Sequence, residues 1–346
     1  MKVLVTGHDG YIGQVLLPVF HRAGHDIVGL DSFLFEGCAL GPEPPEIPAL
    51  RMDLRDLEPA ALQGFDAVVH LAAISNDPLG NLDPRITYAV NHKASVALAR
   101  AAKRAGVSRF LFSSSCSLYG ASGGDAMVTE LAEFKPVTPY GESKVLVERA
   151  VSELGDEDFS PTFLRNATAY GVSPRLRTDL VVNDLVGHAI TSGEVLVKSD
   201  GSPWRPLVHV DDIARAFLAV LDAPREAVHG QAFNVGRNEE NYRIREVAEM
   251  VSEAISGSRV IYADGAEPDI RTYRVDFSKL GASVPTFRPR WTVRGGIEQL
   301  ARAYREHGLT AETFLGTRFI RLDRINERLR EGTLDASLRP LVGARP

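Results

Sequence analysis

The sequence of 346 residues predicts an α/β fold, specifically a Rossmann-type doubly wound parallel sheet with a smaller mixed α/β C-terminal substrate lobe. Two observations carry this prediction. Short runs that are apolar throughout alternate with segments whose apolar residues recur at helical spacing, as in a parallel sheet covered on both faces. In addition, a glycine-rich turn joins the first apolar run directly to the first helical segment.

The elements follow in a regular order up to residue 166. The predicted strands are residues 2–6, 25–31, 50–54, 66–73, 108–115 and 160–166. The predicted helices between them include 11–24, a single long helix over 83–106 that an Asp-Pro pair opens and Gly106 closes, and a helix near 139–150. Beyond this point the alternation becomes irregular, with helices expected at 179–193, 210–223 and 243–256 and a strand at 231–236.

This change of pattern predicts the domain organisation. We expect a cofactor-binding domain in residues 1–165, to which 207–236 returns, and a substrate lobe made of 166–206 and 237–330. The lobe should lie over the carboxyl ends of the strands, where open α/β sheets bind ligands. Residues 331–346 are expected to form a tail.

Composition excludes several classes of function. The net charge is −6 and the basic residues are dispersed, so we expect no nucleic-acid partner and no membrane association. The basic segment 318–330 is predicted to be a solvated helix face, docked on the C-terminal lobe or on a dimer partner. Cys38 and Cys116 have no metal-binding spacing, and no signal peptide or apolar run of about 20 residues is present, which predicts a cytoplasmic protein without a metal site.

The glycine-rich turn predicts a dinucleotide site. Gly7, Gly10 and Gly13 would let the backbone approach a diphosphate at the N-terminus of the following helix. Asp31 ends the second strand, 24 residues after Gly7, where a carboxylate can accept hydrogen bonds from both ribose hydroxyls and would repel a 2′-phosphate. The cofactor is therefore predicted to be NAD rather than NADP, with Asp53 and Leu54 near its adenine.

Tyr140 and Lys144 stand four residues apart, on one face of the predicted helix. Such a pair also occurs on ordinary helix surfaces. A free phenol has a pKa near 10, and a lysine together with a cationic nicotinamide would lower it and favour the phenolate. The pair is therefore a candidate acid–base group, and the rest of the chain must support it.

Several further motifs, in a fixed order, resemble the extended short-chain dehydrogenase/reductase family, and within it the nucleotide-sugar epimerases and dehydratases. The resemblance covers about residues 1–300 and rests on TGHDGYIG at 6–13, HLAA at 70–73, SSSCSLYG at 113–120, PYGESK at 139–144, LRN at 164–166 and RPLVHVDDIA at 205–214. It implies that Tyr140 is the acid–base group, that Ser115 orients the same oxygen and that Lys144 also holds the nicotinamide ribose.

The resemblance also implies contacts with cofactor and substrate. The expected cofactor-binding residues are Gly7, Gly10, Tyr11, Ile12, Gly13, Asp31, Asp53, Leu54, Leu71, Ala72, Ala73, Asn91, Tyr140 and Lys144. The expected substrate-binding residues, for a nucleotide-diphosphate sugar, are Ser75, Ser115, Asn166, Arg205 and Arg271.

The substrate side departs from the family pattern. Pro206 replaces the acid that usually follows the nucleotide-binding arginine, and Glu267 stands near the place of a second arginine, which Arg271 would replace. Arg175 and Arg177 are expected to be solvated rather than ligand-binding.

These features favour an NAD-dependent nucleotide-sugar epimerase that oxidises the hexose transiently, at C4, and forms a homodimer. The alternative is an NAD(P)H-dependent reductase of a 4-keto-6-deoxyhexose nucleotide. A 4,6-dehydratase is disfavoured because Cys116 and Ser117 stand where its acids would be, and a non-enzymatic NAD-binding regulator would not need the Tyr140–Lys144 pair.

Overall fold

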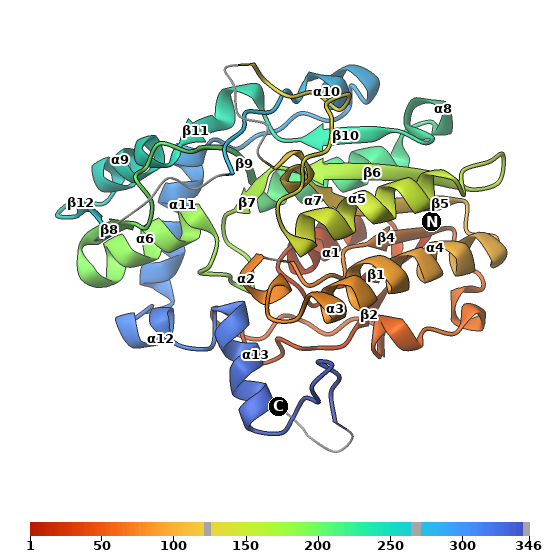
Figure 1. Cartoon of the computed structure of the whole chain (residues 1–346), viewed down its shortest axis with the longest axis horizontal. Coiled ribbons are helices and arrows are strands. Elements are labelled where there is room, and N and C mark those ends of the chain that lie inside the picture. The colour runs from red at the N-terminus through yellow and green to blue at the C-terminus, as the bar shows by residue number, and fades with distance from the viewer. Residues whose placement is uncertain (76, 121–125, 264–270, 342–346) are drawn as a thin grey trace.

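The computed structural model describes residues 1–75, 77–120, 126–263 and 271–341 (Figure 1). Its main element is a seven-stranded sheet in which every pair of neighbouring strands is parallel, in the order β10-β6-β5-β4-β1-β2-β3. The strands are β1 (Lys2–Thr6), β2 (Asp26–Asp31), β3 (Ala49–Arg51), β4 (Ala67–His70), β5 (Arg109–Ser115), β6 (Ser160–Asn166) and β10 (Ala232–Val235). The expected doubly wound parallel sheet is confirmed.

Both faces of this sheet are buried, which explains the apolar runs. Along β1, Val3 and Val5 pack into a core with α1 (Gly13–Arg22) and α7 (Val210–Asp222). Leu4 points to the other face, into a core with α4 (Ser95–Arg104) and α5 (Pro139–Ser152). Because successive side chains of a strand alternate between faces, a strand covered on both sides must be apolar at every position.

The long helix predicted for 83–106 is interrupted. It consists of α3 (Pro84–Thr87), a π-helical turn at Tyr88–Ala94 and α4. The π-helical turn carries Asn91, whose side chain makes three hydrogen bonds away from its own helix. Apolar spacing alone cannot distinguish such a turn from a regular helix. Likewise, the strand predicted at 50–54 is shorter, because Asp53 caps a 3₁₀ turn at Leu54–Asp56.

A smaller lobe forms beside the carboxyl ends of these strands, on the left in Figure 1. It contains two small sheets, β11-β9-β7 and β12-β8. Its elements are β7 (Thr168–Tyr170), α6 (Val181–Ser192), β8 (Glu194–Val197), β9 (Trp204–His209), β11 (Asn241–Arg243), α9 (Ile244–Ala254), β12 (Arg259–Tyr262) and α11 (Val293–Glu306). The remaining short helices are α2 (Asp77–Gly80), α8 (Arg225–Val228), α10 (Ser278–Ser283) and 3₁₀ turns at Pro59–Leu62, Cys116–Tyr119 and Asn238–Glu240.

The C-terminal part of the chain corrects the sequence prediction. Helices α12 (Ala311–Leu315) and α13 (Arg321–Arg330) follow the lobe, and α13 packs near α2, against the sheet domain rather than on the lobe (Figure 1). Arg321 and Arg328 in the segment predicted to be solvated are only 3% and 2% exposed. Their burial depends on distant loops that the local sequence does not specify.

Candidate active site

The glycine turn after β1 is as tight as the sequence predicts. Gly7 has a φ angle of 73°, and a Cβ atom there would lie 2.6 Å from the amide nitrogen of Ala72. A Cβ atom at Gly13 would lie 2.4 Å from the carbonyl oxygen of His8. Since α1 begins at Gly13, its first free N–H groups lie at this turn. The backbone therefore offers donors and a partial positive charge to a diphosphate.

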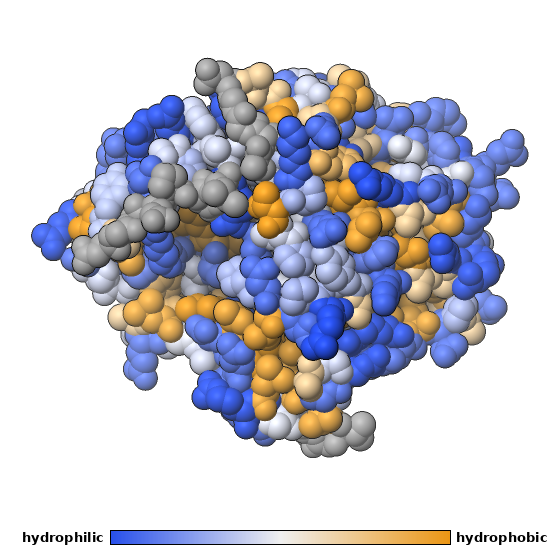
Figure 2. Space-filling model, viewed as in Figure 1, coloured by the Kyte–Doolittle hydropathy of each residue, from blue (hydrophilic) through white to orange (hydrophobic). Residues whose placement is uncertain are grey.

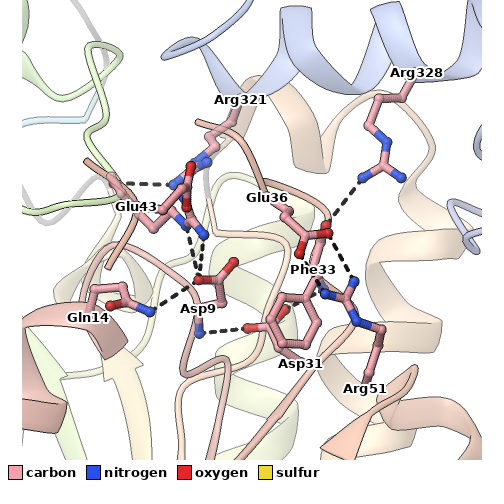
Figure 3. Close-up of polar contacts among 10 residues, drawn as sticks. Asp9, Gln14, Asp31, Phe33, Glu36, Glu43, Arg51, Arg321 and Arg328 are labelled. Atoms are coloured by element: carbon pink, nitrogen blue, oxygen red, sulfur yellow. Dashed lines mark hydrogen bonds and ion pairs between the residues drawn. The ribbon is translucent and has the colours of Figure 1, made fainter. Parts of the chain in front are cut away.

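Asp31 lies beside this turn at the end of β2. Its Oδ2 accepts a hydrogen bond from the amide of Asp9 at 3.0 Å, and its Oδ1 accepts one from the amide of Phe33 at 2.8 Å (Figure 3). Burial raises the pKa of the Asp31 carboxyl, and these two N–H donors oppose that shift. Each carboxylate oxygen keeps a further lone pair, so the group can still accept from ribose hydroxyls. These residues fit NAD.

One pocket runs from the glycine turn to the loops after β3 and β4. Most of the predicted cofactor residues line it, namely Gly7, Gly10, Tyr11, Ile12, Gly13, Asp31, Asp53, Leu54, Leu71, Ala72 and Ala73. Asp53 has a second role, because its carboxylate holds the Arg55 guanidinium at 2.6 Å. Ser75, predicted on the substrate side, lines the same pocket and accepts a hydrogen bond from Arg177.

Asn91 does not line this pocket. It is 1% exposed, and its side-chain oxygen accepts from the Ile74 amide at 2.8 Å, while its nitrogen donates to the Ile74 carbonyl at 2.9 Å. The same side-chain nitrogen also donates to the Ser143 hydroxyl oxygen at 3.3 Å. The structure therefore places Asn91 behind the loop that follows β4, where it fixes the loop that lines the pocket.

Ser115, Tyr140 and Lys144 come together at the carboxyl end of β5. Thr138 caps α5 by accepting from the Gly141 amide, so Tyr140 lies in the first turn of the helix. The Ser115 hydroxyl donates to the Ser117 Oγ at 3.0 Å and lies close enough to the Tyr140 phenol to lower its pKa. Lys144 is 3% exposed and its Nζ donates to the carbonyl of Ser113 at 2.7 Å, 5.6 Å from the centre of the Tyr140 ring.

Burial dominates the pKa of Tyr140 among the protein's own groups. Burial raises it to about 12, while the polar Ser115 side chain nearby opposes the rise. Burial also lowers the pKa of Lys144 to about 7, because the ammonium lies among apolar groups. The protein's own groups thus keep Tyr140 as a phenol near neutral pH, which suits proton donation.

The predicted substrate residues fall into two groups. Asn166 is 6% exposed, and its amide nitrogen donates to the Ser113 hydroxyl at 3.0 Å. Its buried Oδ1 has no hydrogen-bond partner among the described residues. Arg205 and Arg271, 66 residues apart, meet in space, since the Arg205 guanidinium donates to the Arg271 carbonyl. Arg271 also forms an ion pair with Asp77. Glu267 lies outside the described residues.

Arg175 and Arg177 are buried, which corrects the prediction that they are solvated. They are 3% and 7% exposed. Arg175 forms an ion pair with Asp9 at 2.8 Å, and Arg177 pairs with Asp179 at 2.8 Å and lines the pocket. Both follow β7, so only the meeting of the lobe with the glycine turn encloses them.

Further pocket residues have no motif in the sequence. They are Ser32, Leu34 and Phe35 after β2, Val90, Ala169, and Arg321 and Leu338 from the C-terminal region. The first three could have been suspected from their position after the acidic strand end. The sequence around Arg321 and Leu338 contains no motif that would predict their place in the pocket.

Comparison with known proteins agrees with this geometry. The model of the NAD-dependent epimerase/dehydratase family matches residues 3–236. That match covers more than half of the chain. The chain belongs to this family.

Individual relatives share little more than a quarter of their aligned residues with this chain. UDP-glucose 4-epimerase of Neisseria meningitidis serogroup C is 27% identical over 290 residues, which are 75% of this chain and 84% of that protein. The UDP-glucose 4-epimerase of Corynebacterium glutamicum is 28% identical over 269 residues, 73% of this chain and 80% of that protein.

Solved structures give the same picture. MoeE5 in complex with UDP-glucuronic acid and NAD is 28% identical, with a TM-score of 0.76 over 88% of this chain and 99% of its own. The NAD complex of Thermus thermophilus UDP-glucose 4-epimerase is 26% identical, with a TM-score of 0.75 over the same shares of the two chains. The resemblance to the extended short-chain dehydrogenase/reductases, the enzyme class and the dependence on NAD are thereby confirmed. In the described part of the chain, no helix is long and apolar enough to cross a membrane.

Proposed function

We propose that this protein is an NAD-dependent nucleotide-sugar 4-epimerase whose substrate is a UDP-hexose. The observation that carries the proposal is the meeting of Ser115, Tyr140 and Lys144 at the carboxyl end of β5. None of the three lines the pocket that fits NAD, but that pocket is formed at the same edge of the sheet. The relatives named UDP-glucose 4-epimerase support the choice of reaction and nucleotide.

In this proposal Tyr140 moves the proton of the sugar 4-hydroxyl. As a phenol it protonates the oxygen, and as a phenolate it removes the proton, with Ser115 orienting the shared oxygen. Bound NAD supplies the chemistry of accepting and returning the hydride at C4. Lys144 is buried next to the Tyr140 ring, so its charge acts on the phenol through a medium of low polarity.

The nucleotide part of the sugar substrate would be held by residues on the side of the smaller lobe. Arg205 and Arg271 lie together, and guanidinium groups suit a diphosphate because they give charge-assisted hydrogen bonds. The buried Oδ1 of Asn166 remains available to a donor from the substrate. The Arg271–Asp77 ion pair would have to rearrange where Arg271 binds phosphate.

The site argues against a 4,6-dehydratase. Such an enzyme needs an acid next to the catalytic hydroxyl, and Cys116 stands there, 1% exposed, with its Sγ donating to the carbonyl of Arg165 at 3.2 Å. Burial raises the pKa of this thiol, so it cannot serve as the acid.

The test compares Tyr140→Phe with the matched variant Tyr88→Phe, whose hydroxyl donates to Glu142 at 2.5 Å outside the site. Purified protein is incubated with UDP-glucose, UDP-galactose and UDP-glucuronic acid without added cofactor. We expect a 4-epimer of unchanged mass, with turnover reduced about 10³-fold in Tyr140→Phe and unchanged in Tyr88→Phe.

Two results would overturn the proposal. Full turnover in a Tyr140→Phe protein that retains NAD would remove Tyr140 from the chemistry. Activity only on keto-sugars with added NAD(P)H would instead identify the reductase. The homodimer and the cytoplasmic location remain predictions, and sedimentation velocity would test the first.

A further inference from the structure

The C-terminal segment, defined as residues 311–341, closes one side of the cofactor pocket. It lies beyond the part of the chain that the family model matches, which ends at residue 236. Arg321 and Leu338 of this segment line the same pocket as the glycine turn and Asp31. A wall of the cofactor site therefore comes from residues more than 300 positions away from the turn that defines it.

Polar contacts fix the segment to the loops that follow the strands. Arg328 Nη1 donates to the carbonyl of Leu34 at 3.0 Å and to that of Phe33 at 3.3 Å. The Arg55 Nη1 donates to the carbonyl of Ser337 at 2.9 Å, and Arg339 forms an ion pair with Asp56. These bonds attach the segment to the loops after β2 and β3.

Apolar contacts support the same attachment. Ile325, Leu334 and Leu338 form a small core with Ile74 and Leu79, next to the loop after β4. Figure 2 shows apolar side chains continuing onto the surface in the region where α13 lies. The segment is therefore packed on the three pocket loops that follow β2, β3 and β4.

Arg321 is the unusual member of this segment. It is 3% exposed, and its guanidinium stacks on the Phe35 ring at 3.8 Å. Its Nη2 lies 3.4 Å from the carbonyl oxygen of Arg175, and its buried Nη1 has no hydrogen-bond partner in the part of the chain that the structure describes. Figure 3 shows Arg321 and Arg328 reaching from α13 toward the loops of Asp9 and Phe33.

None of the described carboxylates near Arg321 forms an ion pair with it. Asp9 Oδ1 is held by Arg175 and Gln14, while its buried Oδ2 has no hydrogen-bond partner among the described residues, and Arg177 pairs with Asp179. Arg55, the remaining arginine that lines the pocket, is held by Asp53. The charge of Arg321 does favour the ionised form of the Asp31 carboxyl. Burying a guanidinium without an ion-pair partner is costly, so an anion that reached Arg321 would be bound favourably.

We propose that Arg321 binds the diphosphate of NAD, and that the C-terminal segment serves to place this charge opposite the glycine turn. The backbone N–H groups of that turn would hold one side of the diphosphate and the Arg321 guanidinium the other. Asp31 occupies the ribose end with a negative charge, which excludes a 2′-phosphate as the anion. The inference rests on NAD binding, which the family gives, and not on the proposed sugar chemistry.

The experiment measures nucleotide binding in the full chain, without sugar. Arg321→Met keeps the stack on Phe35 and removes the charge, Arg321→Lys keeps the charge, and Arg330→Met is the matched control at an exposed position of α13. NAD content after purification is measured first. Isothermal titration of the nucleotide-free proteins then gives Kd for NAD, NADP, ADP and adenosine.

We expect Arg321→Met to weaken NAD and ADP at least about 10-fold, with adenosine unchanged, since the lost contact is a charge-assisted hydrogen bond. Arg321→Lys should recover part of the loss, and Arg330→Met should equal the unmodified protein. Circular dichroism and Tm of each variant show whether it is folded.

Three outcomes would overturn the inference. Equal NAD affinity in folded Arg321→Met would show that the guanidinium makes no contact. An equal loss for adenosine would move the contact away from the diphosphate, and a loss confined to NADP would assign it to a 2′-phosphate. Failure of the unmodified protein to bind any NAD would instead refute the family's cofactor for this chain, which separates the two claims.

Discussion

The two sides of the cofactor pocket are built in different ways. On one side, the glycine turn and Asp31 act through backbone geometry and a strand end, all within residues 7–31. On the other side, the side chains of Arg177 from the lobe and Arg321 from α13 line the pocket, and Arg175 forms an ion pair with the lining residue Asp9. The first side depends on local conformation, and the second depends on segments that meet only after folding.

Because of this difference, we expect mutations on the two sides of the pocket to act in different ways. The turn should tolerate no added atom, whereas the arginine side should respond to the loss of charge partners. Three predictions test that contrast, starting with the largest effect.

Arg175→Met should destabilise the protein by about 3–5 kcal/mol, because it leaves the buried Asp9 carboxylate without its ion-pair partner. The matched variant Arg294→Met breaks an ion pair with Glu253 whose side chains are 51% and 64% exposed, and should cost less than about 1 kcal/mol. Urea unfolding monitored by circular dichroism gives both values. If the two variants lost the same free energy of unfolding, the burial of the ion pair would not explain the sensitivity of the arginine side.

Gly13→Ala should lower NAD retention more than about 10-fold and destabilise the fold by about 1–3 kcal/mol, because the new Cβ meets two backbone carbonyls. The control is Gly295→Ala in α11, where the added Cβ has only ordinary contacts at 3.5 Å and beyond. This variant should be slightly more stable, since alanine favours a helix. A Gly13→Ala protein with normal NAD content would show that the turn has more room than its geometry indicates.

Lys144→Met should change the pH dependence of stability in nucleotide-free protein. Burial lowers the Lys144 pKa from 10.5 to about 7, so between these values the unfolded chain holds more protons than the folded one. The lysine's contribution to stability therefore rises with pH across this window. The stability of the variant relative to the unmodified protein should be greatest below pH 7 and should decrease up to about pH 10.5. A difference that is constant from pH 6 to about 10 would contradict the assigned burial.

The sequence predicts the regular parts of this molecule well, for an identifiable reason. Apolar runs reveal a sheet covered on both faces, and three glycines reveal a turn with no space for side chains. It predicts less well where an element departs from regularity, as at the π-helical turn around Asn91, because apolar spacing is nearly the same in the two helix types.

Among the candidate site residues, position along the chain was a good guide to the pocket. Asp31, Asp53 and Ala72 line it because each follows a parallel strand, and such strands end at the same edge of the sheet. It was a poor guide to electrostatics, since Arg175 and Arg177 were expected to be solvated and are buried, and since burial raises the pKa of Tyr140 in the protein alone. That sign depends on burial, which only the packed structure reveals.

The doubly wound sheet, the nucleotide-binding turn and the pairing of Tyr140 with Lys144 could be read from the chain alone, because each is encoded within a few neighbouring residues. The contact of Arg175 with Asp9 and the position of Arg321 in the pocket, without an ion pair to any described residue, follow from folding. A charge buried by distant segments has no periodicity or motif of its own. Its environment exists only once those segments have excluded water around it.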